Sequence, residues 1–193
     1  HTNRHIGLTE TIRRIHPTIL IGTSTDHDAF TQQVVEEMCQ EVERPIIMPL
    51  SNPTEKIEAM PADVIAWSKG KALVSVGIPV APFHYEGTRY EIGQGNNALL
   101  YPGLGLGVIV SGAERVSARM IRAAAEAVAS QVDPRPAGSS LLPAVENLRA
   151  SSATVAVAVV QAAIEEGLAT KKPSNVVQAV QDAMWWPHYP PVG

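Results

Sequence analysis

The sequence predicts an α/β fold, in which a parallel sheet has helices on both faces and is followed by an α-helical C-terminal tail. Short apolar runs that end in Gly or in a polar turn alternate with helical patterns over the first part of the 193 residues. Alternation of this kind is typical of parallel sheets, because each helix carries the chain back across the sheet. Beyond residue 112 the composition changes, with 18 alanines in 113–193 against 7 before.

Three apolar runs are expected to be buried strands, at 18–22, 45–50 and 71–77. Each is short and has Gly or Pro at a boundary, which is typical of strands that are covered on both faces. One helical pattern follows Asp28, which stands where an N-cap would be expected. A second, at 61–67, begins with Pro, which the first turn of a helix tolerates.

The rest of the chain contains a hairpin signal and three helical patterns. Residues 83–92 alternate around Glu86-Gly87, a pair that suits a tight turn. Helices are expected at 119–132, 153–168 and 176–185. We therefore expect a sheet domain that continues directly into a helical tail.

The chain divides into three parts on this basis. Residues 1–16 form a poorly defined start, 17–112 the sheet domain and 113–193 its helical extension. The chain begins with His1 instead of Met, and its opening stretch has neither a strand pattern nor that of a leader. We expect the sequence to begin inside a longer one.

Composition excludes several classes of function. Fifteen Lys and Arg against 19 Asp and Glu give a net charge of −4, without the basic block that binding to nucleic acid requires. No apolar run approaches the 18 uninterrupted residues of a spanning helix, so we expect no membrane segment. Cys39 is the one cysteine and cannot form an internal disulfide. A reducing, cytoplasmic location fits best.

Small and polar residues follow all three predicted strands. They are Gly22-Thr23-Ser24, Ser51-Asn52-Pro53 and Gly77-Ile78-Pro79. Ligands of parallel sheets collect at the carboxyl ends of the strands, where these runs meet. Gln94-Gly95-Asn96-Asn97 then precedes an apolar helix, so that two carboxamides stand near a helix N-terminus. These four runs are the candidate binding residues.

Three other features have simpler interpretations. Gly103, Gly105 and Gly107 lack the G-x-G-x-x-G spacing of a dinucleotide turn and follow no suitable strand, so we expect them to allow close packing of a helix. Asp26-His27-Asp28 is typical of a solvated turn with a capping Asp more than of a metal site. Cys39 shares a helix with apolar residues and is expected to be a small buried side chain.

Several long runs resemble the malic enzyme family. They are RPIIMPLSNPT at 44–54, GKALV at 70–74 with Gly77 and Pro79, GQGNNA at 93–98, and YPGLG at 101–105. The similarity extends from about Pro17 to Tyr189 and agrees in order and spacing. It implies the C-terminal part of the family's Rossmann-like NAD-binding domain, hence a partial Rossmann-like sheet here.

The resemblance also implies an activity and a site. The family oxidises L-malate with a nicotinamide cofactor and decarboxylates the product to pyruvate, aided by Mn²⁺ or Mg²⁺. Asn52 and Asn97 match residues that contact both malate and the cofactor. The other matched cofactor positions are Gly22, Thr23, Ser24, Gly77 and Asn96. NAD is the expected cofactor, with NADP as the alternative.

The family's Tyr and Lys that act as acid and base, its metal ligands and its G-x-G-x-x-G turn lie upstream of the matched region. The resemblance therefore implies no catalytic residue and no metal ligand in this chain. We expect it to be inactive by itself, with the N-terminal half of the same enzyme as its partner. Thr25-Asp26-His27-Asp28 stands where the family usually has Gly, which leaves the cofactor contact there open.

Two alternatives remain. Malolactic enzyme, which converts malate to lactate, resembles the same family over the same region, although Gly95 favours malic enzyme slightly. The other is a non-catalytic module that binds nucleotide or assembles subunits through its alanine-rich tail. We expect a homo-oligomer, although burial within one subunit would explain the tail equally well.

Overall fold

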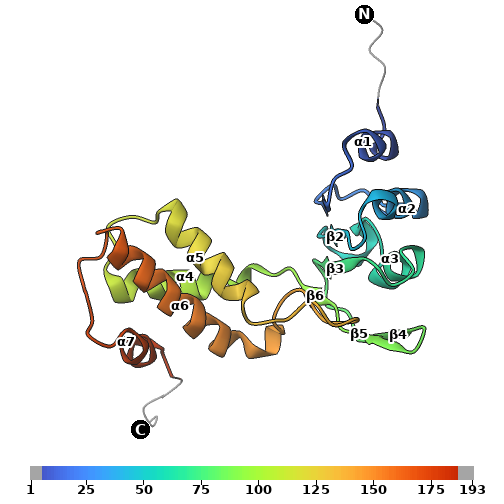
Figure 1. Ribbon diagram of the computed structural model, residues 1–193. Coiled ribbons are helices and arrows are strands. Elements are labelled where there is room, and N and C mark those ends of the chain that lie inside the picture. The colour runs from blue at the N-terminus through green and yellow to red at the C-terminus, as the bar shows by residue number, and fades with distance from the viewer. Residues whose placement is uncertain (1–5, 187–193) are drawn as a thin grey trace, which may run out of the picture. The chain divides into compact units, whose positions relative to one another are not determined.

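The computed structural model describes residues 6–186 and forms two compact units (Figure 1). The first unit comprises 6–96 and 132–144, and the second comprises 97–131 and 145–186. The chain thus enters the second unit after Asn96, returns to the first unit for residues 132–144, and then enters the second unit again. The predicted division of the chain into domains at 1–16, 17–112 and 113–193 stays a prediction.

The first unit is built on a four-stranded sheet in the order β1-β2-β3-β6. Its strands are β1 (Ile19–Gly22), β2 (Ile46–Pro49), β3 (Leu73–Val76) and β6 (Gly93–Gln94). Every neighbouring pair is parallel, with Ile19 opposite Ile46, Ile46 opposite Leu73, and Ser75 opposite Gly93. The three strands expected from apolar runs are present, and the parallel, Rossmann-like sheet is confirmed.

Helices α1 (Leu8–Ile15), α2 (Gln32–Glu41) and α3 (Pro61–Trp67) belong to this unit. The prediction of an N-cap at Asp28 was wrong, because Asp28 has φ 58° and lies in a turn. Thr31 caps α2 instead, its hydroxyl accepting a hydrogen bond from the Val34 amide. Helix α3 begins at Pro61 as predicted. Helix α1 had not been predicted.

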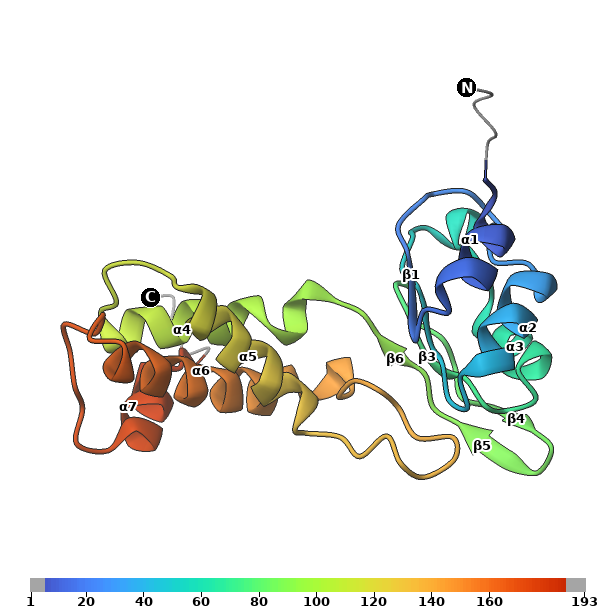
Figure 2. The same ribbon diagram turned by 45° about the horizontal axis from the view of Figure 1, so that its top comes forward.

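All three helices contribute to one core and lie along one side of the sheet (Figure 2). Ile47, Val74 and Val76 of the strands pack with buried residues of α1, α2 and α3. Ile19 and Ile21 point to the other side and are 50% and 58% exposed. Flanking helices are therefore confirmed, but the prediction that the strand at 18–22 would be covered on both faces was wrong within the described residues, because the helices cover one face only.

A short antiparallel hairpin is formed by β4 (Phe83–Tyr85) and β5 (Thr88–Tyr90). Glu86 and Gly87 both have positive φ, as the turn predicted there requires. The rings of Phe83 and Tyr90 stack with their centroids 5.8 Å apart, which joins the hairpin to the core at buried Tyr90.

The second unit is helical. It contains α4 (Tyr101–Ser111), α5 (Ala118–Ala129), α6 (Leu148–Glu165) and α7 (Val176–Ala183), with the 3₁₀ turns η2 (Asn97–Leu99) and η3 (Val145–Asn147). A third 3₁₀ turn, η1 (Thr54–Lys56), belongs to the first unit. The helical tail is confirmed, with α6 beginning five residues earlier than predicted.

The glycines of α4 have different surroundings. A Cβ atom on Gly103 would lie 2.5 Å from Cβ of Val155, and one on Gly107 would lie 2.6 Å from Cβ of Val159, both on α6. Gly105 points away from α6 and has nothing within 4 Å of that position. Close helix packing is thus confirmed for Gly103 and Gly107 and is wrong for Gly105.

Residues 145–165, which include α6, are long and apolar enough to cross a membrane by length and composition, at a mean hydropathy of 1.2. The prediction that no such segment exists was wrong by this criterion. However, Ala156 and Val160 are fully buried among side chains of α4 and α7. Core helices of soluble proteins pass the same test, so the finding is weak evidence for a membrane segment.

The α4 glycines give a stability test. We expect Gly107→Ala to lower the free energy of unfolding by about 1–2 kcal/mol, because the added methyl overpacks the contact with α6. Gly105→Ala should raise it by up to about 1 kcal/mol, because alanine favours a helix and meets nothing there. Urea unfolding of the two variants checks this, and equal effects would contradict the assigned packing.

Candidate functional site

The four parallel strands end along one edge of the sheet, at Gly22, Pro49, Val76 and Gln94. The turn after β1 presents Thr23 and Ser24 to solvent, and the turn after β2 presents Asn52. The predicted residues of the first unit are therefore brought to the same edge, where parallel sheets bind ligands. We call this the strand-end edge, defined by 22–24, 50–52, Gly77 and 94–96.

Asn52 is exposed, whereas Ser51 beside it is buried. The carboxamide Nδ2 of Asn52 lies 3.5 Å from the Leu50 carbonyl oxygen, which is a long contact that leaves the carboxamide oxygen available. The Asn52–Pro53 peptide bond is cis. Asn52 can therefore offer both a donor and an acceptor at the edge.

Gly77 is buried behind Asn52 for a reason of space. A Cβ atom on Gly77 would lie 2.2 Å from the Leu50 carbonyl oxygen and 3.0 Å from Nδ2 of Asn52. The Gly77 amide donates to the Pro49 carbonyl at 3.2 Å, and Nε2 of Gln94 donates to the Gly77 carbonyl at 3.2 Å. Only glycine fits here, so Gly77 fixes how closely the ends of β2 and β3 approach.

Glu58 is a residue of this edge that was not predicted from the sequence. It has no exposed surface, and its carboxylate lies between the turns that follow β1 and β2. Oε1 accepts from the amide and the hydroxyl of Ser24 at 2.7 and 2.9 Å and from the hydroxyl of Ser51. Oε2 accepts from the Ser51 amide at 3.3 Å.

Burial by itself would raise the pKa of the Glu58 carboxyl. Hydrogen bonds from Ser51 and Ser24 to the ionised form outweigh that effect, and the pKa is lowered from its ordinary value of 4.5. The carboxylate is therefore ionised at neutral pH. None of the ion pairs among the described side chains includes Glu58, so hydrogen-bond donors alone surround its charge.

The two remaining predicted residues stand where the chain leaves the first unit. Asn96 is half-buried at the end of that unit, just after Gly95, whose amide donates to the Val76 carbonyl at 2.7 Å. Asn97 is exposed and begins η2 of the second unit, four residues before α4 begins. The helix that Asn97 opens is thus a 3₁₀ turn.

Asp26-His27-Asp28 forms an exposed turn, in which Nδ1 of His27 lies 3.1 Å from the Ile57 carbonyl oxygen. Within residues 6–186, no three His, Cys, Asp or Glu side chains gather in a way that could hold a metal ion. Burial raises the pKa of the half-buried Cys39 thiol, which disfavours the reactive thiolate. The prediction of a buried Cys39 was therefore wrong in part, because the side chain is only half-buried.

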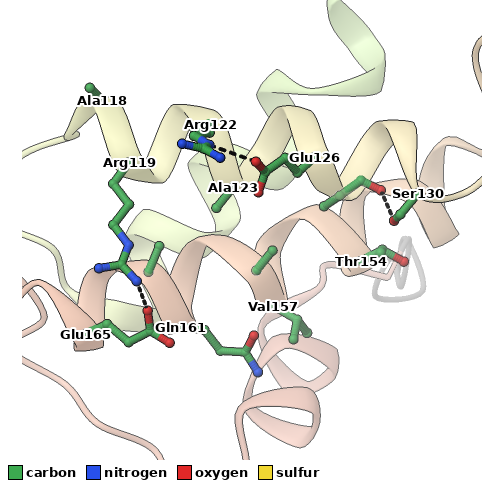
Figure 3. A pocket seen from close by; sticks show the side chains of 13 residues that line it. Ala118, Arg119, Arg122, Ala123, Glu126, Ser130, Thr154, Val157, Gln161 and Glu165 are labelled. Atoms are coloured by element: carbon green, nitrogen blue, oxygen red, sulfur yellow. Dashed lines mark hydrogen bonds and ion pairs between the residues drawn. The ribbon is translucent and has the colours of Figure 1, made fainter.

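A groove of about 1040 Å³ lies between α5 and α6 in the second unit (Figure 3). Alanines line much of it, and its charged residues pair with each other, Arg119 with Glu165 and Arg122 with Glu126. It contains none of the predicted site residues. The groove therefore offers no acid, base or ligand set comparable with the strand-end edge.

The chemistry available at the strand-end edge is binding and orientation. Its exposed side chains are those of Thr23, Ser24 and Asn52, which are neutral at physiological pH, and the Ser24 hydroxyl already donates to Glu58 and accepts from the Asp26 amide. The ionised group, Glu58, is buried beneath them and already accepts four hydrogen bonds. Such an edge can hold a polar ligand, whereas proton transfer needs groups from elsewhere.

Comparison with known proteins identifies the family. The family model described as "Malic enzyme, NAD binding domain" matches residues 1–164. The chain belongs to the malic enzyme family. A putative NAD malate oxidoreductase of Mycobacterium tuberculosis is 53% identical over 184 residues, which are 95% of this chain and 34% of that protein. The malolactic enzyme of Lactococcus lactis is 46% identical over 94% of this chain and 34% of its own length.

A solved malic enzyme of Pyrococcus horikoshii has a similar fold. It aligns with a TM-score of 0.70 and 26% identity over 92% of this chain and 36% of the other. The chain spans about a third of the length of the curated relatives it matches. It covers the NAD-binding domain of malic enzymes, which agrees with the position of the strand-end edge.

Glu58 gives a prediction on pH. A carboxyl whose pKa is lowered on folding stabilises the protein above the unfolded pKa, and this stabilisation is lost as pH falls through the folded pKa. We expect the unfolding free energy to fall from about pH 4.5 downward, and to fall less in Glu58→Gln. Urea unfolding at pH 7 and 3.5 checks this, and an identical loss in both proteins would contradict it.

Proposed function

We propose that this chain supplies the nicotinamide half of the NAD site and part of the L-malate pocket in an NAD-dependent malic enzyme that converts malate to pyruvate and CO₂. The observation that carries the proposal is the strand-end edge, where Asn52, Gly77 and the turn 22–24 meet. Membership of the family adds the cofactor and substrate class.

The residues present at the edge fit a dinucleotide. Gly22 and Gly77 carry no side chain, so that a ligand can approach the main chain there. The exposed residue Thr23 offers a hydroxyl beside them, whereas the hydroxyl of Ser24 is hydrogen-bonded to Glu58. Neutral donors and acceptors of this kind suit ribose hydroxyls and a carboxamide. We propose that Gly22, Thr23, Ser24, Asn52, Gly77, Asn96 and Asn97 hold the cofactor.

Asn52 and Asn97 are also the proposed malate contacts. NAD, when bound, accepts a hydride from C2 of malate, and this transfer requires both partners in a fixed orientation. Carboxamides can orient a carboxylate or hydroxyl by hydrogen bonds without acting as a competing acid. Asn52 and Asn97 therefore orient the reactants, and the proton transfers are left to groups outside the described residues.

Mn²⁺ or Mg²⁺ is the further cofactor that the family resemblance implies. The described side chains do not fit it, because no suitable group of His, Cys, Asp or Glu forms among them. We propose that the ligands of this ion lie in the N-terminal half of the same enzyme. The dependence on that half is also why we propose that the chain alone is inactive.

Substitution of the two asparagines tests the proposal. In the complete enzyme, we expect Asn52→Ala and Asn97→Ala each to lower kcat/KM for malate by at least about tenfold, roughly 1.4 kcal/mol of transition-state stabilisation. Steady-state kinetics with both malate and NAD varied give the value. If neither variant changed kcat/KM, the site assignment would be wrong and a non-catalytic module would be favoured.

Malolactic enzyme is the second candidate, because one of the relatives with about half of its residues identical has that name. We expect the complete enzyme to release pyruvate with one NADH per malate. Analysis of the products with the absorbance of NADH as a second readout decides between them. Lactate without net NADH formation would favour the malolactic reaction.

Assembly and location stay predictions. A homo-oligomer and a cytoplasmic enzyme are proposed, with neither nucleic acid nor membrane as a partner. The net charge of −4 supports the exclusion of nucleic acid, and the single cysteine supports a reducing location. The burial of Ala156 and Val160 within the helical unit supports a chain without a membrane partner.

A further inference from the structure

The buried carboxylate of Glu58 joins two turns that are far apart in the sequence. Ser24 lies 34 residues before Glu58, and Ser51 lies 7 residues before it. Both amides and both hydroxyls donate to the same carboxylate. One side chain therefore holds the end of β1 against the end of β2.

Main-chain hydrogen bonds strengthen the same connection. The Phe30 amide donates to the Glu58 carbonyl at 2.9 Å, and the Asp28 amide donates to the Ile57 carbonyl at 3.2 Å. The Thr25 amide donates to the Ser51 hydroxyl at 2.9 Å. The whole segment from Ser24 to Phe30 is thus fastened to the residues that follow β2.

The carboxylate of Glu58 packs closely against Gly22, with no space left for a side chain between them. A Cβ atom on Gly22 would lie 2.6 Å from Cδ of Glu58 and 2.7 Å from Cζ of Phe30. The carboxylate therefore rests directly against the backbone of the β1 turn. A change in the position or the hydrogen bonding of the carboxylate therefore shifts the backbone of that turn directly.

We propose that Glu58 is a positioning residue that sets the separation between the turn 22–24 and Asn52. The inference rests on the proposed function, in which the turn holds the dinucleotide and Asn52 contacts malate and the nicotinamide ribose. Glu58 touches neither ligand and acts through Ser24 and Ser51. It thereby fixes the cofactor relative to the substrate.

Hydride transfer is sensitive to such a separation. A misplacement of about 1 Å by a residue away from the chemistry can lower the rate by about 100-fold. Glu58→Gln keeps the size of the side chain but replaces one carboxylate oxygen by an NH₂ group, which donates and cannot accept. An NH₂ group in place of Oε2 faces the Ser51 amide, and in place of Oε1 it faces the Ser24 amide and both hydroxyls, so at least one donor loses its partner and the turn that contains it is released.

The test compares Glu58→Gln with Glu37→Gln in the complete enzyme. Glu37, on α2, is 8% exposed and accepts from Nη2 of Arg13 at 3.0 Å, away from both turns. The two variants therefore remove a carboxylate from a buried glutamate by the same chemical change. Kinetics, thermal unfolding and amide hydrogen exchange of peptides that contain Ser24 and Ser51 are measured for each.

We expect Glu58→Gln to lower kcat by at least about tenfold, with a smaller change in KM for malate, because orientation is lost more than binding. Exchange at Ser51, at Ser24 or at both should become faster in this variant and stay unchanged at both in Glu37→Gln. The control should keep the kcat of the parent enzyme. Equal effects of the two variants on kcat, or a normal kcat in Glu58→Gln, would overturn the inference.

Two further variants keep the outcome clear. If Glu58→Gln does not fold, Ser51→Ala removes one donor to the carboxylate, and we expect it to lower kcat in the same direction by about threefold or more. A normal kcat in Ser51→Ala would then overturn the inference.

Asn52→Ala separates this inference from the proposed function. If Asn52→Ala lowers kcat/KM while the Glu58 variant does not lower kcat, only the inference fails. If neither Asn52→Ala nor Asn97→Ala has an effect, the proposed function itself fails.

Discussion

A carboxylate that is buried without a cation must be surrounded by hydrogen-bond donors, and at Glu58 these donors come from two separate turns. This requirement accounts for several residues at once. Ser24 and Ser51 supply hydroxyls in addition to their amides, and Gly22 leaves the space that the carboxylate occupies. The arrangement of the strand-end edge therefore follows from how one negative charge is accommodated.

The second constraint at this edge is the close approach of backbones. Gly77 brings β3 next to the Leu50 carbonyl, and Gly95 packs against the Leu50 side chain in a similar way. Both contacts place main-chain atoms where a side chain would otherwise project. The exposed side chains of the edge are therefore those of Thr23, Ser24 and Asn52, with Gln94 and Asn96 half-buried beside them.

The sheet could be predicted from the sequence because strands covered by helices appear as short apolar runs, such as 45–50. Asn52 and Gly77 could be placed because they follow such runs. Helix α1 was missed although Leu8, Ile12 and Ile15 recur at helical spacing, because the pattern covers only eight residues and buries Ile12 alone. The cap of α2 was assigned to the wrong residue because Asp28 and Thr31 are both of types that cap helices, and the positive φ that places Asp28 in a turn is not visible in the sequence.

Glu58 was missed for a different reason. It stands between Ile57 and Ala59, after a polar stretch, and a charged residue there is ordinarily exposed. Its burial depends on donors that tertiary structure brings from 34 residues away. The glycines of α4 were predicted as a group, but only the helix geometry shows that Gly103 and Gly107 share one face and Gly105 another.

The uncovered side of the sheet has a practical consequence. Strand β1 lies at an edge of the described sheet, and it exposes Ile19 and Ile21 on the face that the described helices of the first unit leave open. A strand edge with apolar side chains beside it is a template for pairing with other chains. In isolation, the chain would therefore be prone to aggregate through the exposed edge of β1. Its solubility would depend on whatever covers Ile19 and Ile21.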